Sequence, residues 1–270
     1  MADPAALAQL ARLVDVMHRL RAPGGCPWDR EQTPRSLRPF VIEEAYEVIE
    51  AIDHGDPGEL CLELGDLLLQ VVFQAELASE RGDFHLGDVA CAIADKLERR
   101  HPHVFGDATV RDAGEVVRNW QRIKAQERAA RGHHGVLAGV PGALPALARA
   151  QAVGDKLGRV GFDWPDAVAV LEKLDEERAE LDAAMARGDR DGAGRELGDV
   201  LLTLTSLARH LGVDAETALR EATGRLVGRV DRVEAAVTAA GGSLEGLAAD
   251  ERDRLWDQAK AAEPPHPGLV

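Results

Sequence analysis

The sequence is poor in cysteine and has no long apolar run. Its only cysteines are Cys26, Cys61 and Cys91, an odd number without a Cys-x-x-Cys pair. Neither a disulfide framework nor a thiolate zinc site is therefore favoured. The apolar stretch 67–73 is interrupted by a glutamine and is far shorter than the roughly 20 residues that cross a membrane. The start of the chain, 1–20, lacks a basic segment followed by an apolar block. We expect a cytoplasmic protein with reduced thiols and no membrane partner.

Positive charge is also scarce. The chain has 32 Lys and Arg against 47 Asp and Glu, which gives a net charge of −15 and a pI near 5.0. Without a diffuse positive field a nucleic-acid backbone is not attracted, so we expect no nucleic-acid partner. An anionic substrate would have to arrive together with a cation. The chain also has neither a Gly-x-x-x-x-Gly-Lys phosphate loop nor a Gly-x-Gly-x-x-Gly turn.

Strand-like alternation is missing, and helical periodicity takes its place. Apolar residues recur every three to four positions in the ranges 7–20, 38–53, 59–80, 86–99, 168–186, 194–211 and 215–238. Glycine, proline and aspartate interrupt this rhythm, which predicts turns at 55–58 and 188–194. The sequence therefore predicts an all-α fold.

The second half of the chain repeats the first. When Glu63 is aligned with Glu196, "ELGDLLL" (63–69) matches "ELGDVLL" (196–202) at every position but one. The same alignment brings four acids of the first half, Glu44, Glu47, Glu63 and Asp66, onto Glu177, Glu180, Glu196 and Asp199. With small changes of length, Lys96 and Arg100 correspond to Arg225 and Arg229, and Trp120 and Lys124 correspond to Trp256 and Lys260. We predict two tandem helical-bundle repeats.

The composition suggests where the repeats meet. The stretch "RGHHGVLAGVPGALP" (131–145) is rich in glycine and proline, and the proline-rich "EPPHPGLV" ends the chain. We predict a first repeat at 1–130, a linker at 131–146, a second repeat at 147–262 and a loose tail at 263–270. One difference between the repeats is "CPWD" (26–29), for which the second half has only "FDW" (162–164).

The acids have helical spacing. Glu44 and Glu47 are one turn apart on one helical stripe, and Glu63 and Asp66 share another. If the segment 53–58 turns the chain back on itself, the two pairs stand nearly level across the helix interface. Four carboxylates at one place would raise one another's pKa values unless a cation lies among them. The pattern therefore predicts a metal site in each repeat.

The ligand chemistry indicates which metal. Aspartate stands where the Glu-x-x-His of di-iron bundles would place its histidine, so the set is all oxygen. Such a site suits Mg²⁺ or Mn²⁺, which bind substrate phosphates. A lone Glu-Glu-x-x-Glu is common on the solvated face of a helix, but two copies in the same hairpin register disfavour that reading.

These motifs also resemble a known family. Glu-Glu-x-x-Glu followed by Glu-x-x-Asp across a helical hairpin resembles the signature of the all-α nucleoside triphosphate pyrophosphohydrolases. The stretches "GGCPWDREQT" (24–33) and "LERRHPHVFGD" (97–107) and the tandem arrangement are similar to the MazG family, and the likeness covers residues 10–260. The resemblance implies an enzyme that uses Mg²⁺ to convert a nucleoside triphosphate and water into the monophosphate and pyrophosphate, as a homodimer of helical bundles.

The resemblance implies site residues in both repeats. The metal ligands would be Glu177, Glu180, Glu196 and Asp199 in the second repeat and Glu44, Glu47, Glu63 and Asp66 in the first. Nucleotide contacts would come from Lys173, Arg225, Arg229, Trp256 and Lys260, and by correspondence from Lys96, Arg100, Trp120 and Lys124. A lone Trp in a helix is nevertheless more often part of a core.

The chemistry of phosphoryl transfer agrees with these roles. Water must be positioned, and charge on the phosphoryl oxygens must be neutralised. Glu176, next to the ligand stripe, is our candidate for orienting or deprotonating that water, with Glu43 as its counterpart. Lys173 precedes the second set of acids by about one turn, whereas the matching residue of the first repeat is Phe40. We therefore expect the second repeat to carry most of the turnover.

Two other functions compete with this one. A fragment of a Nudix box at 195–197 lacks the Glu-Glu that should follow, and Nudix folds need a mixed sheet. The remaining alternative is a non-catalytic helical module that binds metal and nucleotide or a protein partner. Intact acid sets in both repeats favour the enzyme, which could serve to clear non-standard nucleotides.

Overall fold

The computed structural model describes residues 3–130, 132 and 135–263, and all regular elements among them are helices. The predicted all-α fold is confirmed. The chain divides into two compact units, Met1–Ala125 and Gln126–Val270.

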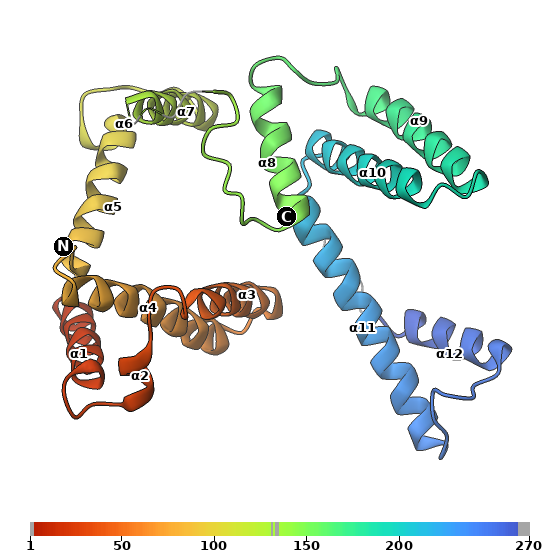
Figure 1. The fold of residues 1–270 in the computed structure, drawn as a ribbon, viewed down its shortest axis with the longest axis horizontal. Coiled ribbons are helices and arrows are strands. Elements are labelled where there is room, and N and C mark those ends of the chain that lie inside the picture. Colours follow the sequence, from red (N-terminus) through yellow and green to blue (C-terminus); the bar gives the residue numbers. More distant parts are fainter. Residues whose placement is uncertain (1–2, 131, 133–134, 264–270) are drawn as a thin grey trace. The chain divides into compact units, whose positions relative to one another are not determined.

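The first unit is built around a helical hairpin. Its helices are α1 (Pro4–Arg21), α2 (Pro27–Glu31), α3 (Arg38–His54), α4 (Pro57–Glu80), α5 (Leu86–Arg100), α6 (Pro102–Phe105) and α7 (Ala113–Ala130), which runs past the boundary between the units. Helices α3 and α4 lie side by side and antiparallel (Figure 1). Gly55 ends α3 with a φ of 74°, and the Asp56 carboxylate accepts a hydrogen bond from the Gly58 N–H at 2.8 Å to start α4. The turn predicted at 55–58 is confirmed at Gly55 and Asp56, and α4 already begins at Pro57.

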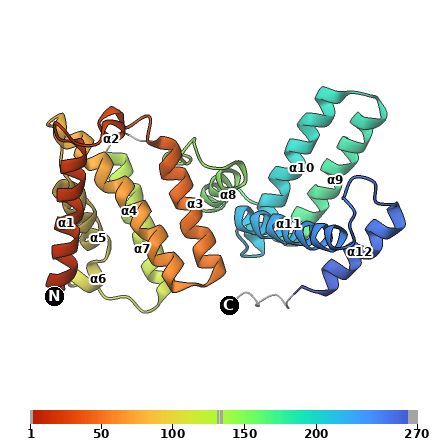
Figure 2. The same ribbon diagram turned by 90° about the horizontal axis from the view of Figure 1, so that it is seen from below.

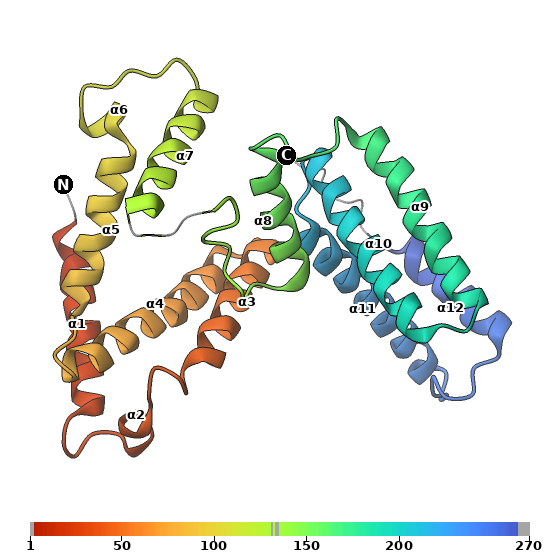
Figure 3. The same cartoon turned by 45° about the horizontal axis from the view of Figure 1, so that its top comes forward.

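Helix α1 packs against α4 and closes the core of this unit (Figure 3). Met17, Leu37, Val72, Phe73 and Leu77 form the buried cluster, with Leu13 and Phe40 against it. Met17 is 1% exposed and Phe73 3%. Apolar burial of this kind stabilises the position of the hairpin that carries the acids.

The second unit repeats this order of elements. Its helices are α8 (Ala146–Gly158), α9 (Ala167–Ala186), α10 (Arg190–His210), α11 (Ala215–Ala239) and α12 (Ala249–Ala261). Helices α9 and α10 form an antiparallel hairpin (Figure 2), α8 packs on α10, and α12 packs on α11. Val233, Val237, Leu255 and Ala259 form a buried cluster between α11 and α12. Thus α8, α9, α10, α11 and α12 are the counterparts of α1, α3, α4, α5 and α7.

The turn predicted at 188–194 was wrong in extent. Helix α10 already begins at Arg190, because the Asp189 carboxylate accepts a hydrogen bond from the Gly192 N–H at 2.9 Å and caps the first turn. Gly192 and Gly194 therefore lie inside the helix. Only Gly188 of these three has the positive φ, 69°, that favours glycine in a turn.

The predicted domain limits stay a prediction, although α7 ends at Ala130 and α8 begins at Ala146. Of the predicted tail, Glu263 accepts hydrogen bonds from Arg229 at 2.6 and 2.9 Å, and residues 264–270 lie outside the described residues. None of the described helices combines the length and the apolar character that a membrane span requires. The cytoplasmic location stays a prediction.

Candidate metal centres and their surroundings

The α3–α4 hairpin brings three of the predicted acids together. One carboxylate oxygen each of Glu44, Glu63 and Asp66 lies within 4.8 Å of the others, and we call these residues the first acid group. Burial raises the pKa of Glu44 above its usual range, and a hydrogen bond to Glu47 and the charge of Asp66 raise it further. Burial and the charges of Glu47 and Asp66 also raise the pKa of Glu63. These ionised carboxylates are therefore costly without a cation.

The α9–α10 hairpin repeats this arrangement. Oxygens of Glu177, Glu196 and Asp199 lie within 4.8 Å of one another, and we call these residues the second acid group. Glu177 is only 8% exposed. The donors are oxygens only, which fits a hard divalent cation such as Mg²⁺ or Mn²⁺.

The second acid group has a neighbouring cation from its own helix. Lys173 Nζ lies 3.0 Å from Glu177 Oε1 and 3.0 Å from Glu176 Oε2. These hydrogen bonds, to Glu176 first and then to Glu177, raise the pKa of Lys173. At the corresponding position of the first repeat, Phe40 packs against the core, with its ring centroid 5.9 Å from that of Trp28. The two acid groups therefore differ in local charge.

The fourth predicted ligand of each set lies outside these groups. Glu47 and Glu180 are exposed one helical turn beyond Glu44 and Glu177, and the predicted water-orienting residues Glu43 and Glu176 are exposed as well. Glu47 is close enough to raise the pKa of both Glu44 and Glu63. Roles for these exposed acids stay predictions.

The predicted nucleotide-contacting residues form matching pairs in the two repeats. The Arg100 guanidinium lies over the Trp120 ring at 5.3 Å, and that of Arg229 lies over Trp256 at 5.6 Å. Lys124 Nζ is 4.9 Å from the centre of the Trp120 ring. Trp256 also packs against the α11–α12 core. Of the other predicted cations, Arg225 and Lys260 are exposed and Lys96 is half-buried.

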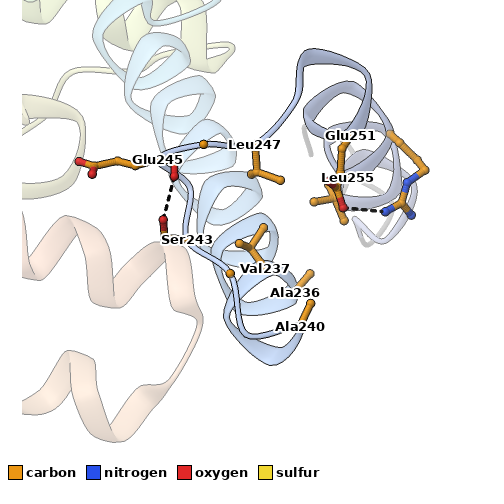
Figure 4. A pocket seen from close by; sticks show the side chains of 11 residues that line it. Ala236, Val237, Ala240, Ser243, Glu245, Leu247, Glu251 and Leu255 are labelled. Atoms are coloured by element: carbon orange, nitrogen blue, oxygen red, sulfur yellow. Dashed lines mark hydrogen bonds and ion pairs between the residues drawn. The ribbon is translucent and has the colours of Figure 1, made fainter.

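Two cavities of the second unit lie outside the predicted sites. One, of ≈ 450 Å³, lies between the end of α11 and α12 beside Val237 and Leu255 (Figure 4). At its edge the Ser243 hydroxyl donates a hydrogen bond to the Glu245 carbonyl, and Arg254 forms an ion pair with Glu251. The other, of ≈ 480 Å³, is lined by Phe162 and Trp164. Sequence reasoning missed both cavities, although the reordered "FDW" was a signal for the second.

Comparisons with known proteins agree with this geometry. A family model described as the MazG nucleotide pyrophosphohydrolase domain matches residues 32–105 and 167–233, which contain the two acid hairpins. The nucleoside triphosphate pyrophosphohydrolase of Escherichia coli K12 is 44% identical over 258 residues, covering 94% of this chain and 98% of that protein. The Thermotoga maritima nucleoside triphosphate pyrophosphohydrolase/pyrophosphatase MazG is 43% identical over 251 residues, covering 93% and 95%.

A more distant relative shares a smaller part of its length. The nucleoside triphosphate pyrophosphohydrolase of Mycolicibacterium smegmatis is 34% identical over 233 residues, covering 84% of this chain and 61% of that protein. The family resemblance inferred from the acid motifs is confirmed by the family model and by relatives that match nearly the whole chain. This chain belongs to the MazG nucleotide pyrophosphohydrolase family.

Proposed function

We propose that the protein hydrolyses nucleoside triphosphates to the monophosphate and pyrophosphate, with Mg²⁺ or Mn²⁺ held by Glu177, Glu196 and Asp199. The observation that carries this proposal is the oxygen-only acid group, which occurs in both hairpins of a chain of this family. A bound divalent cation would neutralise charge on the phosphoryl oxygens and activate a water molecule. The convergence of these three carboxylates supports the proposed position of that cation.

The other residues of the site have defined tasks in this reaction. Water attacks the α-phosphorus, the bond from that phosphorus to the bridging oxygen breaks, and pyrophosphate leaves. The exposed carboxylate of Glu176 accepts the proton of the attacking water. Lys173 pairs with Glu176 and Glu177 at 3.0 Å in the free protein and exchanges one of these partners for a phosphate oxygen when substrate binds. Arg225 is exposed and can bind the departing pyrophosphate.

The second repeat performs most of the turnover in this proposal. Its acid group has Lys173 beside it, whereas the first repeat places Phe40 at the same position, where it is part of the core. An aromatic ring cannot neutralise phosphate charge. The first repeat therefore contributes packing, dimerisation or weaker hydrolysis.

A second copy of the chain is the proposed partner. Large apolar side chains on the hairpins and on α11 are solvent-exposed in the single chain, including Leu62 (68%), Val168 (63%), Leu197 (49%) and Leu226 (50%). Faces of this kind mark protein interfaces. Sedimentation should give the mass of a dimer, and Leu197→Glu should shift it towards the monomer. A monomeric wild-type protein would contradict this part of the proposal.

The activity is tested by product analysis. Purified protein is incubated with Mg²⁺ and separate standard and deaminated triphosphates, and the products are separated by anion-exchange chromatography. We expect monophosphate and pyrophosphate in equal amounts. Diphosphate with free phosphate would contradict the proposed bond cleavage, and binding without any product would favour the non-catalytic module. Comparison of the rates would test a role in clearing non-standard nucleotides.

A further inference from the structure

A buried amide borders the first acid group. Gln70 follows Glu63 and Asp66 on α4 at the spacing i, i+3 and i+7, so the three side chains share one stripe of the helix. Its Nε2 donates a hydrogen bond to Glu44 Oε1 on the facing helix α3, at 3.4 Å. Gln70 is only 6% exposed. The amide therefore lies at the contact of the two helices that carry the acids.

The oxygen of this amide has no partner among the described residues. Gln70 Oε1 is buried, and no donor of that part of the chain reaches it. Such an acceptor is uncommon, because it gives up its hydrogen bonds to water and gains none in return. Amide oxygens are ligands for hard divalent cations. Since Oε1 is bonded to the same carbon as the nitrogen that contacts Glu44, it lies where a cation beside the acids can use it.

The second repeat surrounds its buried glutamate differently. The alignment of the two hairpins places Thr203 at the position of Gln70. Thr203 is 4% exposed, and its side chain has no carbonyl oxygen. Glu177, the counterpart of Glu44, instead has Lys173 Nζ at 3.0 Å. The buried glutamate thus has a neutral amide beside it in the first repeat and an ammonium group in the second.

This difference leaves the first acid group with more of its negative charge. The largest charge effects on Glu44 come from Asp66 and Glu47, which are both acids. In the second acid group the ammonium of Lys173 offsets part of the charge, and it competes with a divalent cation for the same oxygen of Glu177. Without substrate, a cation should therefore bind the first acid group more tightly than the second.

We propose that the first acid group and the amide oxygen of Gln70 form a resident divalent-cation site, which is occupied without nucleotide. Gln70 supplies a further oxygen ligand there, and its N–H holds the Glu44 carboxylate. The cation joins α3 to α4 through ligands from both helices. This site goes beyond the proposed function, in which a cation at the second acid group serves turnover. The first repeat keeps its cation between turnovers, and the second takes one together with its substrate.

Titration of the nucleotide-free protein with Mn²⁺ alone tests where the tighter site lies. Free Mn²⁺ gives an electron paramagnetic resonance signal that weakens on binding, so the measurement needs no turnover. Glu177→Gln removes a ligand of the second acid group, and Glu44→Gln removes the matching ligand of the first. The Glu177→Gln protein should bind Mn²⁺ at least about tenfold more tightly than the Glu44→Gln protein. Equal affinities, or tighter binding by the Glu44→Gln protein, would overturn the proposal.

Two changes at Gln70 in the Glu177→Gln background test the amide oxygen. Gln70→Leu removes it and should lower the Mn²⁺ affinity by about tenfold or more. Gln70→Glu keeps an oxygen at the same place and should bind Mn²⁺ more tightly than Gln70→Leu does. An unchanged affinity in Gln70→Leu would overturn the proposal.

A control on the same helix separates ligation from the effect of added charge. Gln74 lies one turn further along α4, and its amide donates to the Pro34 carbonyl at 3.4 Å. Gln74→Glu adds the same charge as Gln70→Glu without a ligand at the site. The gain in Mn²⁺ affinity should be larger for Gln70→Glu. Equal gains would show that the residue at position 70 acts only through its charge, and would overturn the role of the oxygen.

A further variant keeps the test decisive if Gln70→Leu fails to fold. Gln70→Thr introduces the residue that the second repeat buries at this position. Its Mn²⁺ affinity should fall to a similar extent, and an unchanged affinity would overturn the proposal. All titrations are made without triphosphate. A wild-type protein that hydrolyses no triphosphate would therefore contradict the proposed function and leave the outcome of this test unaffected.

Discussion

Lys173 Nζ lies 3.0 Å from Glu177 Oε1, so an internal cation touches the most buried carboxylate of the second acid group. A divalent cation that binds Glu177 must share that carboxylate with the lysine or displace it. In the first repeat α3 supplies no lysine at this place, because Phe40 stands at the matching position. The two sites should therefore respond differently to metal and to substitution.

Replacing Lys173 with methionine should separate its role with the metal from its role in catalysis. In Lys173→Met the metal-free protein loses the cation beside Glu177, so Mg²⁺ should raise its Tm by more than it raises that of the wild type. The same variant should lose kcat/KM, because a phosphate loses a positive partner. Thermal melting with and without Mg²⁺ and steady-state kinetics measure the two effects. Arg178→Met, which removes an exposed ion pair with Asp175 on the same helix, is the control. Equal Mg²⁺-induced shifts in Lys173→Met and the wild type would contradict this interpretation.

Metal should stabilise the folded protein as well as activate it. The pKa values of Glu44 and Glu63 are raised above 4.5, so ionising them opposes folding, and this loss of stability grows as pH rises through the raised pKa values. Without metal, the free energy of unfolding should therefore fall as pH rises from acidic to neutral, because these carboxyl groups lose their protons. Mg²⁺ at 100 times its Kd should raise the free energy of unfolding by about 2.7 kcal/mol for each site that it occupies. Urea unfolding at several pH values, with Mg²⁺ or with a chelator, measures this. No effect of the chelator on either rate or stability would show that the acids hold no metal.

Substitution of matched ligands should reveal which repeat is active. Glu177→Gln and Glu44→Gln change equivalent residues of the two acid groups, and only the first should reduce kcat strongly, by about 100-fold or more, if its metal serves the reaction. Glu180→Ala and Glu47→Ala should show the same order, which also tests whether these exposed acids act as ligands. Rates on one triphosphate under saturating Mg²⁺ are the measurement. The opposite order would assign the turnover to the first repeat, and equal losses would mean that both repeats work.

The Arg209–Asp163 ion pair should stabilise the second unit in a pH-dependent way. Hydrogen bonds from Arg209 hold the pKa of Asp163 below its usual range. The stability that this pair contributes is therefore fully present above the unfolded pKa, about 3.9, and is lost as pH falls through the lower folded value. Asp163→Asn should cost about 2 kcal/mol at pH 7 and progressively less below pH 4. Urea unfolding of the variant and the wild type at pH 7 and at a pH below 4 measures this difference.

The control is Asp83→Asn, which breaks an exposed ion pair with Arg81 and should lower the free energy of unfolding by less than about 1 kcal/mol. A pH-independent cost at Asp163 would show that the ion pair is not its cause.

The sequence by itself determined the helices, the duplication and the chemistry of the acids. Helical periodicity is a local property, so the hairpin ranges follow from the spacing of near neighbours along the chain, and the turn at Gly55 follows from its residue types. The turn at 188–194 was placed too far along the chain because glycine weakens a helix only moderately, and a cap at Asp189 outweighs that cost. The internal match of Glu63 with Glu196 was visible because residue identities within one chain can be aligned without a structure.

Tertiary structure alone decided which side chains meet. Three of the four predicted acids of each repeat converge, because the register between two helices depends on how their side chains pack and not on spacing along one of them. The contact of Lys173 with Glu177 depends on the rotamers of these two side chains, which the spacing along the helix does not fix. The cavity beside Trp164 depends on the packing of α8 against α10, where Ala150 and Ser206 approach from distant positions in the sequence. A missing side-chain volume has no signature in the helical periodicity of the sequence, so the cavity becomes visible only in the folded structure.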